Sequence, residues 1–306
     1  MRDLKPITVK NVSLEKGLLS ERMRVIREEV IPYQWRALND EVPHAEPSHA
    51  MENLRIAAGE GEGVHRGFVF QDSDLAKWLE AVGYRLATHP DPELERTADE
   101  AIALLARAQE ADGYLNSYYT IMKPDQRWTN LRDDHELYCA GHFIEAAVAY
   151  YEGTGKRELL DIVCRFVDLI DSVFGLEPGK LKGYPGHQEI ELALVRLYSV
   201  TADKKHLNLA KFFIDQRGQE PHYFAEEAQK RGQKSPYWYT WGHEYNQSHL
   251  PVRQQTTAVG HSVRAMYMYS AMVDLAKAAN DPGLLEASKT LWQNVVSKRM
   301  YITGGL

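Results

Sequence analysis

The chain has 306 residues, of which 44% are hydrophobic, and its formal net charge is −7. This length allows one large core, and the negative charge provides no basic stripe for the phosphate backbone of a nucleic acid. No apolar run is long enough to predict a membrane span, and the N-terminal sequence lacks the apolar segment of a secretory signal. Two cysteines without CxxC spacing exclude a disulfide framework. We therefore expect a cytoplasmic protein without nucleic-acid or membrane partners.

Two elements are expected near the N-terminus. Apolar residues alternate with polar ones within residues 1–14, which favours a short strand there. A helix is expected from residue 19 to residue 38. Pro32 has no backbone N–H and cannot continue a regular helix, so this helix should break or kink near Val30.

Four later segments share one pattern, in which an amphipathic run ends in a short turn and a second amphipathic run follows at once. Apolar residues recur every three or four positions on both sides of the first turn, and two prolines between Thr88 and Pro92 mark that turn. In the second hairpin, Gly153 and Gly155 are expected to allow positive φ after the helix end. The pattern predicts helical hairpins, and their uneven spacing favours one closed all-α toroid over a solenoid. We expect a single domain over residues 1–306.

Two segments between the hairpins, 112–134 and 218–255, are long and rich in aromatic residues. Loops of this length in a compact domain are usually functional or disordered, and disordered segments are poor in aromatic residues. We therefore expect an ordered binding rim, with Trp238, Trp241 and Tyr245 among its rings.

A histidine stands at the start of three predicted helices: His135, His187 and His261. If these helices pack side by side, the three imidazoles converge at one end of the bundle. Polar groups that bind hydroxyls, beside aromatic rings that stack on C–H faces, are what a carbohydrate site requires. Two other interpretations remain open: His135 can be a solvated residue in a capping sequence, and aromatic loops also line protein interfaces.

Candidate acids and metal ligands are less specific. His142 lies seven residues after His135, on the same face of the predicted helix, and is expected to fill the core. No pair of histidines has a zinc-binding spacing, so we expect no metal site formed by this chain alone. Paired carboxylates are the usual machinery of glycosidases, and the sequence does not choose among six candidates. These are Asp72, Asp74, Glu136, Glu189, Glu191 and Glu244.

Eight motifs follow one another along nearly the whole chain: IPYQWRALND (31–40), DSDLAKWLEA (72–81), DGYLNSYY (112–119), HELYCAGHFIEAAVAYYEGTGK (135–156), GHQEIELALVRLY (186–198), YNQSHLPVRQQ (245–255), AVGHSVRAMYMY (258–269) and YITGG (301–305). Together they resemble glycoside hydrolase family 127, the β-L-arabinofuranosidase group. The resemblance implies an (α/α)6 barrel and a glycoside hydrolase that cleaves β-L-arabinofuranosides of plant origin with retention. It also implies a small carbohydrate substrate. The substrate-binding residues expected here are Gln34, His135, His187, His249 and His261.

The same resemblance implies a zinc-bound cysteine thiolate as nucleophile, with a glutamate as acid/base. In the family these groups follow the TGG sequence, whereas this sequence stops at Leu306, and neither Cys139 nor Cys164 matches a ligand position. We therefore expect the catalytic residues beyond Leu306, with zinc in the full-length protein and none bound by residues 1–306. The barrel is expected to be incomplete at its C-terminus, and this fragment to be inactive alone.

Two alternatives remain. One is another (α/α)6 carbohydrate enzyme, such as a sugar epimerase or an unsaturated glucuronyl hydrolase, in which rim histidines or an aspartate act as acid and base. The other is a non-catalytic sugar-binding protein. An incomplete toroid would expose apolar faces, so association into a homo-oligomer is a further expectation to test.

Overall fold

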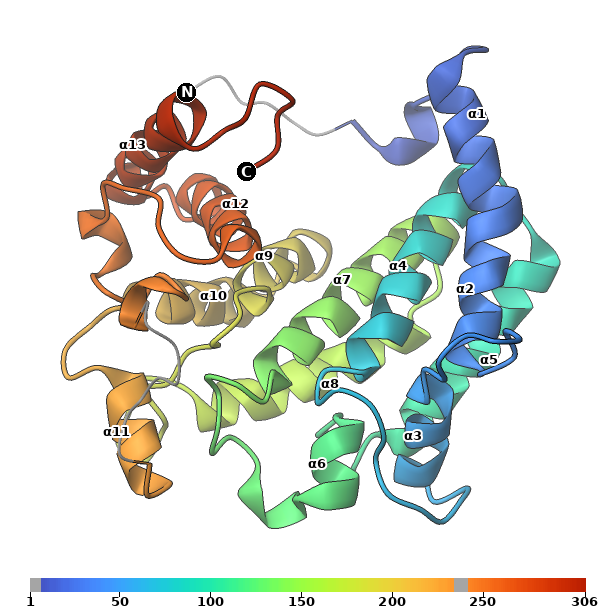
Figure 1. Ribbon diagram of the computed structural model, residues 1–306, viewed down its shortest axis with the longest axis horizontal. Helices are drawn as coiled ribbons and strands as arrows, with labels where there is room; N and C mark the ends of the chain where they lie inside the picture. Colours follow the sequence, from blue (N-terminus) through green and yellow to red (C-terminus); the bar gives the residue numbers. More distant parts are fainter. Residues whose placement is uncertain (1–6, 234–241) are drawn as a thin grey trace. The chain divides into compact units, whose positions relative to one another are not determined.

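The computed structural model describes residues 7–233 and 242–306, and every regular element in them is helical (Figure 1). Within these residues the only β-type pairing is an isolated bridge between Phe174 and Leu181. None of the described helices combines the length and apolar character needed to cross a membrane. The α-helices are α1 (Leu18–Val25), α2 (Ile31–Leu38), α3 (Ala50–Ala57), α4 (Asp72–Thr88), α5 (Pro92–Ala108), α6 (Ser117–Met122), α7 (Glu136–Thr154), α8 (Glu158–Val173), α9 (Ile190–Thr201), α10 (Lys204–Gln216), α11 (Tyr223–Lys230), α12 (Ser262–Ala278) and α13 (Pro282–Lys298).

The chain divides into two compact units. The first comprises Met1–Met122 and Glu145–Arg165, and the second comprises Lys123–Ile144 and Phe166–Leu306. Helices α7 and α8 each contribute residues to both units. The all-α class expected from the sequence is confirmed, and the single domain over residues 1–306 stays a prediction.

The strand expected within residues 1–14 is wrong for the described part of that segment. Val9–Asn11 forms a single 3-10 turn, η1, and no strand pairs with it among the described residues. The apolar side chains remain exposed, Val9 at 41% and Val12 at 52%. Alternation alone does not make a strand, because a strand needs a partner for its backbone groups. Residues 1–6 lie outside the described residues.

The helix expected over residues 19–38 is interrupted just before Pro32, as the proline predicts. Between α1 and α2 the chain forms a π-helical segment, η2 (Ile26–Val30). The backbone N–H of Ile31 donates to the carbonyl of Ile26, five residues earlier. Because proline offers no N–H, the turn before it widens instead of ending the helix.

The first hairpin, α4 and α5, forms as predicted. Helix α4 ends at Thr88 and α5 begins at Pro92, so both prolines lie in or next to the turn. The side chain of Asp91 caps α5 by accepting the backbone N–H groups of Glu93 (3.2 Å) and Leu94 (3.1 Å). The boundary between α4 and α5 therefore follows from two local features of the sequence, the turn prolines and the Asp91 cap.

In the second hairpin, α7 and α8, the prediction that two glycines follow the helix end is confirmed for Gly155 and wrong for Gly153. Gly155 follows α7 with φ of +82°, as expected. Gly153 instead lies inside α7, where a Cβ atom would stand 2.3 Å from the carbonyl oxygen of Gly83 in α4. A Cβ at Gly83 would in turn stand 2.6 Å from the backbone of Ala149. These glycines let α4 and α7 touch backbone to backbone (Figure 1).

Two more hairpins build the second unit. Helix α9 turns into α10 through Ala202, at φ of 58°, and α12 turns into α13 through Asn280, at φ of 53°. Asp203 and Asp281 cap the second helix of each pair. Helix α9 packs against α10 and α12, and α12 packs against α13 (Figure 1).

Both long aromatic segments contain a helix in the part that the structure describes. Residues 112–134 contain α6 and residues 218–255 contain α11. In α11 the buried residues are Phe224, Glu227 and Ala228, a spacing typical of one helical face. The expected rim aromatics Trp238 and Trp241 lie outside the described residues.

Candidate functional site

Three imidazoles converge in the second unit. His135 immediately precedes α7, His187 precedes α9 by three residues, and His261 is the N-cap of α12. The ring centroids of His135 and His187 are 5.9 Å apart, and those of His187 and His261 are 6.0 Å apart. The helix starts therefore bring these side chains to one place, as their positions in the sequence predict. We call these three residues the histidine rim.

Glycines bring the backbones of the histidine rim together. A Cβ at Gly186, next to His187, would lie 1.9 Å from the carbonyl oxygen of Arg132, in the segment before α7. A Cβ at Gly260, next to His261, would lie 2.0 Å from the carbonyl oxygen of Glu244, and Gly260 has φ of +75°. Only glycine allows such close approach, so these two glycines are required for the backbone packing that places His187 and His261.

Hydrogen bonds set the tautomers of the rim. Nδ1 of His135 contacts the backbone carbonyl of Asp133, and Nδ1 of His187 lies 2.8 Å from the backbone carbonyl of Gln188. Carbonyl oxygens only accept, so both Nδ1 atoms donate, and Nε2 of each neutral ring is an acceptor. His261 differs, because its Nδ1 accepts a backbone N–H of α12 at 3.5 Å. Its Nε2 therefore carries the proton and donates.

The rim is uncharged at neutral pH. Burial lowers the pKa of His135 to about 4 and the pKa of His187 to about 2. Burial also lowers the pKa of His261. The guanidinium of Arg264 acts on all three pKa values in the same direction. The rim thus offers neutral hydrogen-bonding groups rather than cations.

Two tyrosines beside the rim were not singled out from the sequence. The ring of Tyr138 lies 4.6 Å from that of His187 and 5.4 Å from that of His135, centroid to centroid. The ring of Tyr267 lies 5.9 Å from that of His187. Tyr138 follows His135 by three residues, so the helical period was the available signal. For Tyr267 the corresponding signal was the aromatic pair in the AMYMY sequence.

One aromatic residue expected at the rim is found there. The ring of Tyr245 packs edge-on against that of His261, with centroids 5.6 Å apart. The guanidinium carbon of Arg264 lies 4.4 Å from the centroid of the same tyrosine ring. Tyr245 therefore connects the segment 218–255 to the histidine rim.

His142 is buried, as expected, but it has a charged neighbour. Its Nδ1 lies 3.3 Å from a carboxylate oxygen of Glu189, and the two side chains are 4% and 1% exposed. The ring of His142 packs edge-on against that of Tyr138, with centroids 4.4 Å apart. Glu189 is thus the candidate carboxylate that lies beside the rim.

The other candidate carboxylates have other surroundings. Glu244 is exposed, although its backbone contacts Gly260. Four more are engaged by nearby groups that account for their positions: Asp72 accepts the backbone N–H of Ser117 at 2.7 Å, Asp74 accepts from Gln71 at 2.9 Å, Glu136 accepts the backbone N–H of Trp128 at 2.8 Å, and Glu191 pairs with Arg217 at 3.0 Å.

Two expected substrate-binding residues have different neighbours. Gln34 is exposed on α2, in the first unit. His249 is half-buried in the second unit, where burial lowers its pKa and the nearby charges are those of Glu244 and His222. The role of Gln34 and His249 in binding stays a prediction.

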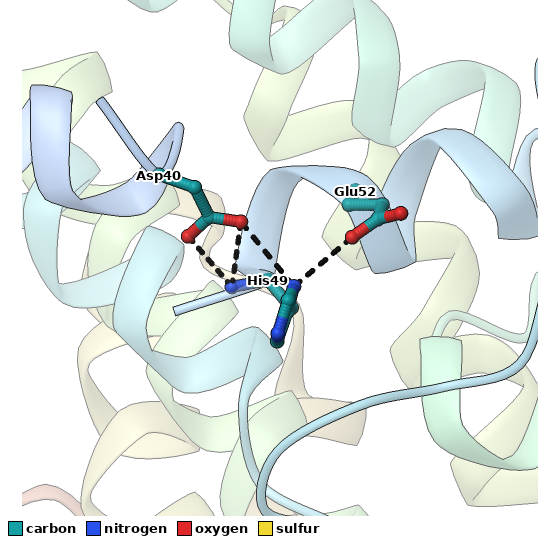
Figure 2. A group of neighbouring side chains, drawn as sticks. All are labelled: Asp40, His49 and Glu52. Atoms are coloured by element: carbon teal, nitrogen blue, oxygen red, sulfur yellow. Dashed lines mark hydrogen bonds and ion pairs between the residues drawn. The ribbon is translucent and has the colours of Figure 1, made fainter. Parts of the chain in front are cut away.

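One group of potential metal ligands occurs among the described residues: Asp40, His49 and Glu52, in the first unit (Figure 2). Their ligand atoms lie within 4.8 Å of one another. Nδ1 of His49 is 3.0 Å from Glu52 and 3.3 Å from Asp40. Asp40 also accepts the backbone N–H groups of Ser48 (2.6 Å) and His49 (3.0 Å), which holds the start of α3. These backbone hydrogen bonds account for the position of Asp40 without an ion.

The cysteines lie on separate helices. Cys139 is buried in α7 and Cys164 is partly buried in α8. Neither belongs to the ligand group of Figure 2, which contains no thiol. The described residues therefore do not fit a zinc site built on cysteine thiolates, and we assign no reaction step to zinc.

Comparison with known proteins identifies the family. The family model described as "Beta-L-arabinofuranosidase, GH127 catalytic domain" matches residues 11–306. The chain belongs to this family. With the helical architecture, this confirms the (α/α)6-barrel class expected from the sequence.

Relatives extend the match over nearly all of the chain. A non-reducing end β-L-arabinofuranosidase of Bifidobacterium longum subsp. longum is 40% identical, over 97% of this chain and 48% of the relative. The solved structure of Ara127N-Se, a GH127 β-L-arabinofuranosidase from Geobacillus stearothermophilus T6, is 59% identical with a TM-score of 0.95, over 97% of this chain and 47% of that one. The GH127 β-arabinofuranosidase BT3674 is 36% identical with a TM-score of 0.86, over 98% and 45%. The chain thus spans about half the length of these relatives.

Proposed function

We propose that this chain supplies the sugar-binding part of a β-L-arabinofuranosidase catalytic domain. The whole protein would hydrolyse terminal β-L-arabinofuranosides of plant origin with retention of configuration. The observation that carries the proposal is the histidine rim, where three neutral imidazoles lie within about 6 Å of their neighbours. The relatives named as β-L-arabinofuranosidases support the choice of sugar.

The hydrogen-bonding character of the rim suits a furanoside. A sugar hydroxyl donates one hydrogen bond and accepts others. Nε2 of His135 and Nε2 of His187 accept, whereas Nε2 of His261 donates. A sugar with neighbouring hydroxyl groups can therefore donate to two rings and accept from the third. Tyr138 and Tyr267 supply aromatic surface beside these groups for the C–H faces of the ring.

The reaction itself needs groups beyond the rim. With pKa values near 4 and 2, His135 and His187 are almost wholly unprotonated at neutral pH and are weak bases, so they are suited to binding rather than to proton transfer. We propose that zinc and the thiolate nucleophile belong to the whole protein, and that residues 1–306 bind no zinc and turn over no substrate alone. The protein would be cytoplasmic, and its partner a small carbohydrate.

A panel of sugars tests the proposal. Calorimetric titration of the chain with methyl β-L-arabinofuranoside should give saturable binding, with weaker binding of the α-anomer and of L-arabinopyranosides. Aryl β-L-arabinofuranosides should remain uncleaved by the chain and be cleaved by the whole protein. Preferential binding of an unsaturated uronide, or epimerisation of a free sugar, would favour another carbohydrate enzyme. Sugar binding with no hydrolysis by the whole protein would favour a non-catalytic sugar-binding protein.

A further inference from the structure

A buried histidine–carboxylate pair lies directly behind the histidine rim. Nδ1 of His142 is 3.3 Å from Oε1 of Glu189, and both side chains are almost fully excluded from solvent. His142 comes from α7, and Glu189 is the N-cap residue of α9. Burying two ionisable groups costs desolvation that two apolar side chains of similar size would avoid. The pair therefore contributes little to stability, and a role in orienting neighbouring groups explains it better.

Gly141 makes this pairing sterically feasible. A Cβ atom at Gly141 would lie 2.6 Å from Cγ of Glu189 and 2.7 Å from the backbone nitrogen of Ile190. Helix α7 and the start of α9 therefore approach within backbone contact at this point, and the Glu189 side chain passes over the bare face of the glycine. The carboxylate can then reach the imidazole of the next residue, His142.

The pair contacts the rim along two routes. The first is through Tyr138, whose ring packs edge-on against His142 at 4.4 Å and lies tilted against His187 at 4.6 Å, centroid to centroid. The second is along the backbone, because Glu189 follows Gln188, whose carbonyl oxygen accepts the Nδ1 proton of His187. Both routes lead to the same imidazole, the central ring of the rim.

We propose that Glu189 and His142 are positioning residues for His187. The Glu189 carboxylate lies 3.3 Å from Nδ1 of His142 and holds the His142 ring in place, the His142 ring supports Tyr138, and Tyr138 fixes the plane of the His187 ring. Glu189 also anchors the backbone that carries the Gln188 carbonyl, which keeps the His187 proton on Nδ1. Nε2 of His187 then remains an acceptor aimed at the sugar. This inference rests on the proposed function only for the identity of the ligand.

The matched variants are Glu189→Gln, which keeps the shape and removes the charge, and the double variant His142→Leu with Glu189→Met, which replaces the pair by apolar groups. Asp72→Asn is the control, because Asp72 is a carboxylate about as buried as Glu189 but accepts from Ser117 in the first unit. Two quantities are measured for each protein: the affinity for methyl β-L-arabinofuranoside and the ¹⁵N signals of the His187 imidazole without sugar. The thermal midpoint is recorded alongside.

Glu189→Gln and the double variant should each weaken sugar binding about tenfold, the effect of one misaligned hydrogen bond. Both should shift the ¹⁵N signals of His187, and the double variant should keep the wild-type thermal midpoint. Asp72→Asn should leave the affinity and the His187 signals unchanged. Wild-type affinity and unshifted His187 signals in Glu189→Gln would overturn the proposal, whether or not the double variant folds. A wild-type chain that binds no sugar would contradict the proposed function, while the His187 signals would still decide this inference.

Discussion

The Nδ1 atom of His187 donates a hydrogen bond of 2.8 Å to the backbone carbonyl oxygen of Gln188. This contact leaves Nε2 of a buried, neutral ring as an acceptor for a ligand. His187 lies between the rings of His135 and His261, so its orientation decides how the three groups act together. The arrangement requires all three rings to stay neutral at the pH where sugar is bound.

The first prediction concerns pH. Burial depresses the pKa of His135 to about 4 and of His187 to about 2 in the folded chain, against an ordinary value of 6.5. The unfolded chain therefore binds more protons between pH 6.5 and pH 4, so this contribution to stability is present above pH 6.5 and lost as the pH falls. His135 and His187 should stay neutral from pH 8 to about 5, so their contribution to sugar affinity should stay constant over this range.

Urea unfolding at pH 7 and pH 5 checks the stability, with His135→Gln and His187→Gln as comparison proteins. The loss of stability between the two pH values should be smaller in both variants than in the wild type. A binding transition centred near pH 6.5 would instead show that the rim titrates like exposed histidine.

The second prediction concerns Gly153. An alanine there places its Cβ 2.3 Å from the backbone of Gly83, so α4 and α7 must separate. We expect Gly153→Ala to lower the free energy of unfolding by about 3 kcal/mol, at the upper end of overpacking effects. Gly17→Ala is the control, because nothing lies within 4 Å of a Cβ at Gly17. Equal urea midpoints for the two variants would mean that α4 and α7 do not need this contact.

The third prediction separates backbone hydrogen bonding from metal binding at Asp40. Loss of the carboxylate removes the acceptor for the backbone N–H groups of Ser48 and His49, so Asp40→Ala should cost about 1 to 2 kcal/mol in urea unfolding. Added zinc should leave the thermal midpoint of the wild-type chain unchanged. A zinc-dependent rise that His49→Ala abolishes would assign a cation to the group in Figure 2.

The fourth prediction concerns exposed apolar side chains along α1, η2 and α2. Leu19, Met23, Ile26, Val30 and Tyr33 are 67%, 47%, 42%, 37% and 48% exposed, at alternating spacings of four and three residues. Such a stripe should bind a hydrophobic dye and promote association at high concentration. Replacing Leu19 and Ile26 by serine should reduce dye fluorescence and favour the monomer in sedimentation velocity. Identical sedimentation and fluorescence for both proteins would rule out this stripe as the associating surface.

Much of the scaffold follows from local signals in the sequence. Asp91 and Pro92 mark the start of α5, and Pro32 marks the π-helical segment η2 that precedes Pro32. Capping and the missing proline N–H both act within one helical turn, so the sequence shows them directly. The positions of His135 and His187 at helix starts were visible for the same reason. The short strand expected near Val9 failed because alternation was present without a partner strand.

The rest of the site depends on contacts between distant segments. Gly153 looked like a helix terminator because its packing partner, Gly83, is seventy residues away. The pairing of His142 with Glu189 similarly depends on the approach of α9 to Gly141, which periodicity within α7 does not encode. The helical period placed Tyr138 on the His135 face, but only the packing shows that its ring supports His187.

The central claim, that His187 binds the sugar, is tested most directly by His187→Ala in the whole protein. Loss of a hydrogen bond that tightens in the transition state should cost about 1.5 to 3 kcal/mol, or roughly tenfold to a hundredfold in kcat/KM on an aryl β-L-arabinofuranoside. The thermal midpoint should change little, and the exposed His89→Ala should change neither quantity. Unchanged kcat/KM in His187→Ala, or a loss of activity that follows a collapse of the thermal midpoint, would contradict the account.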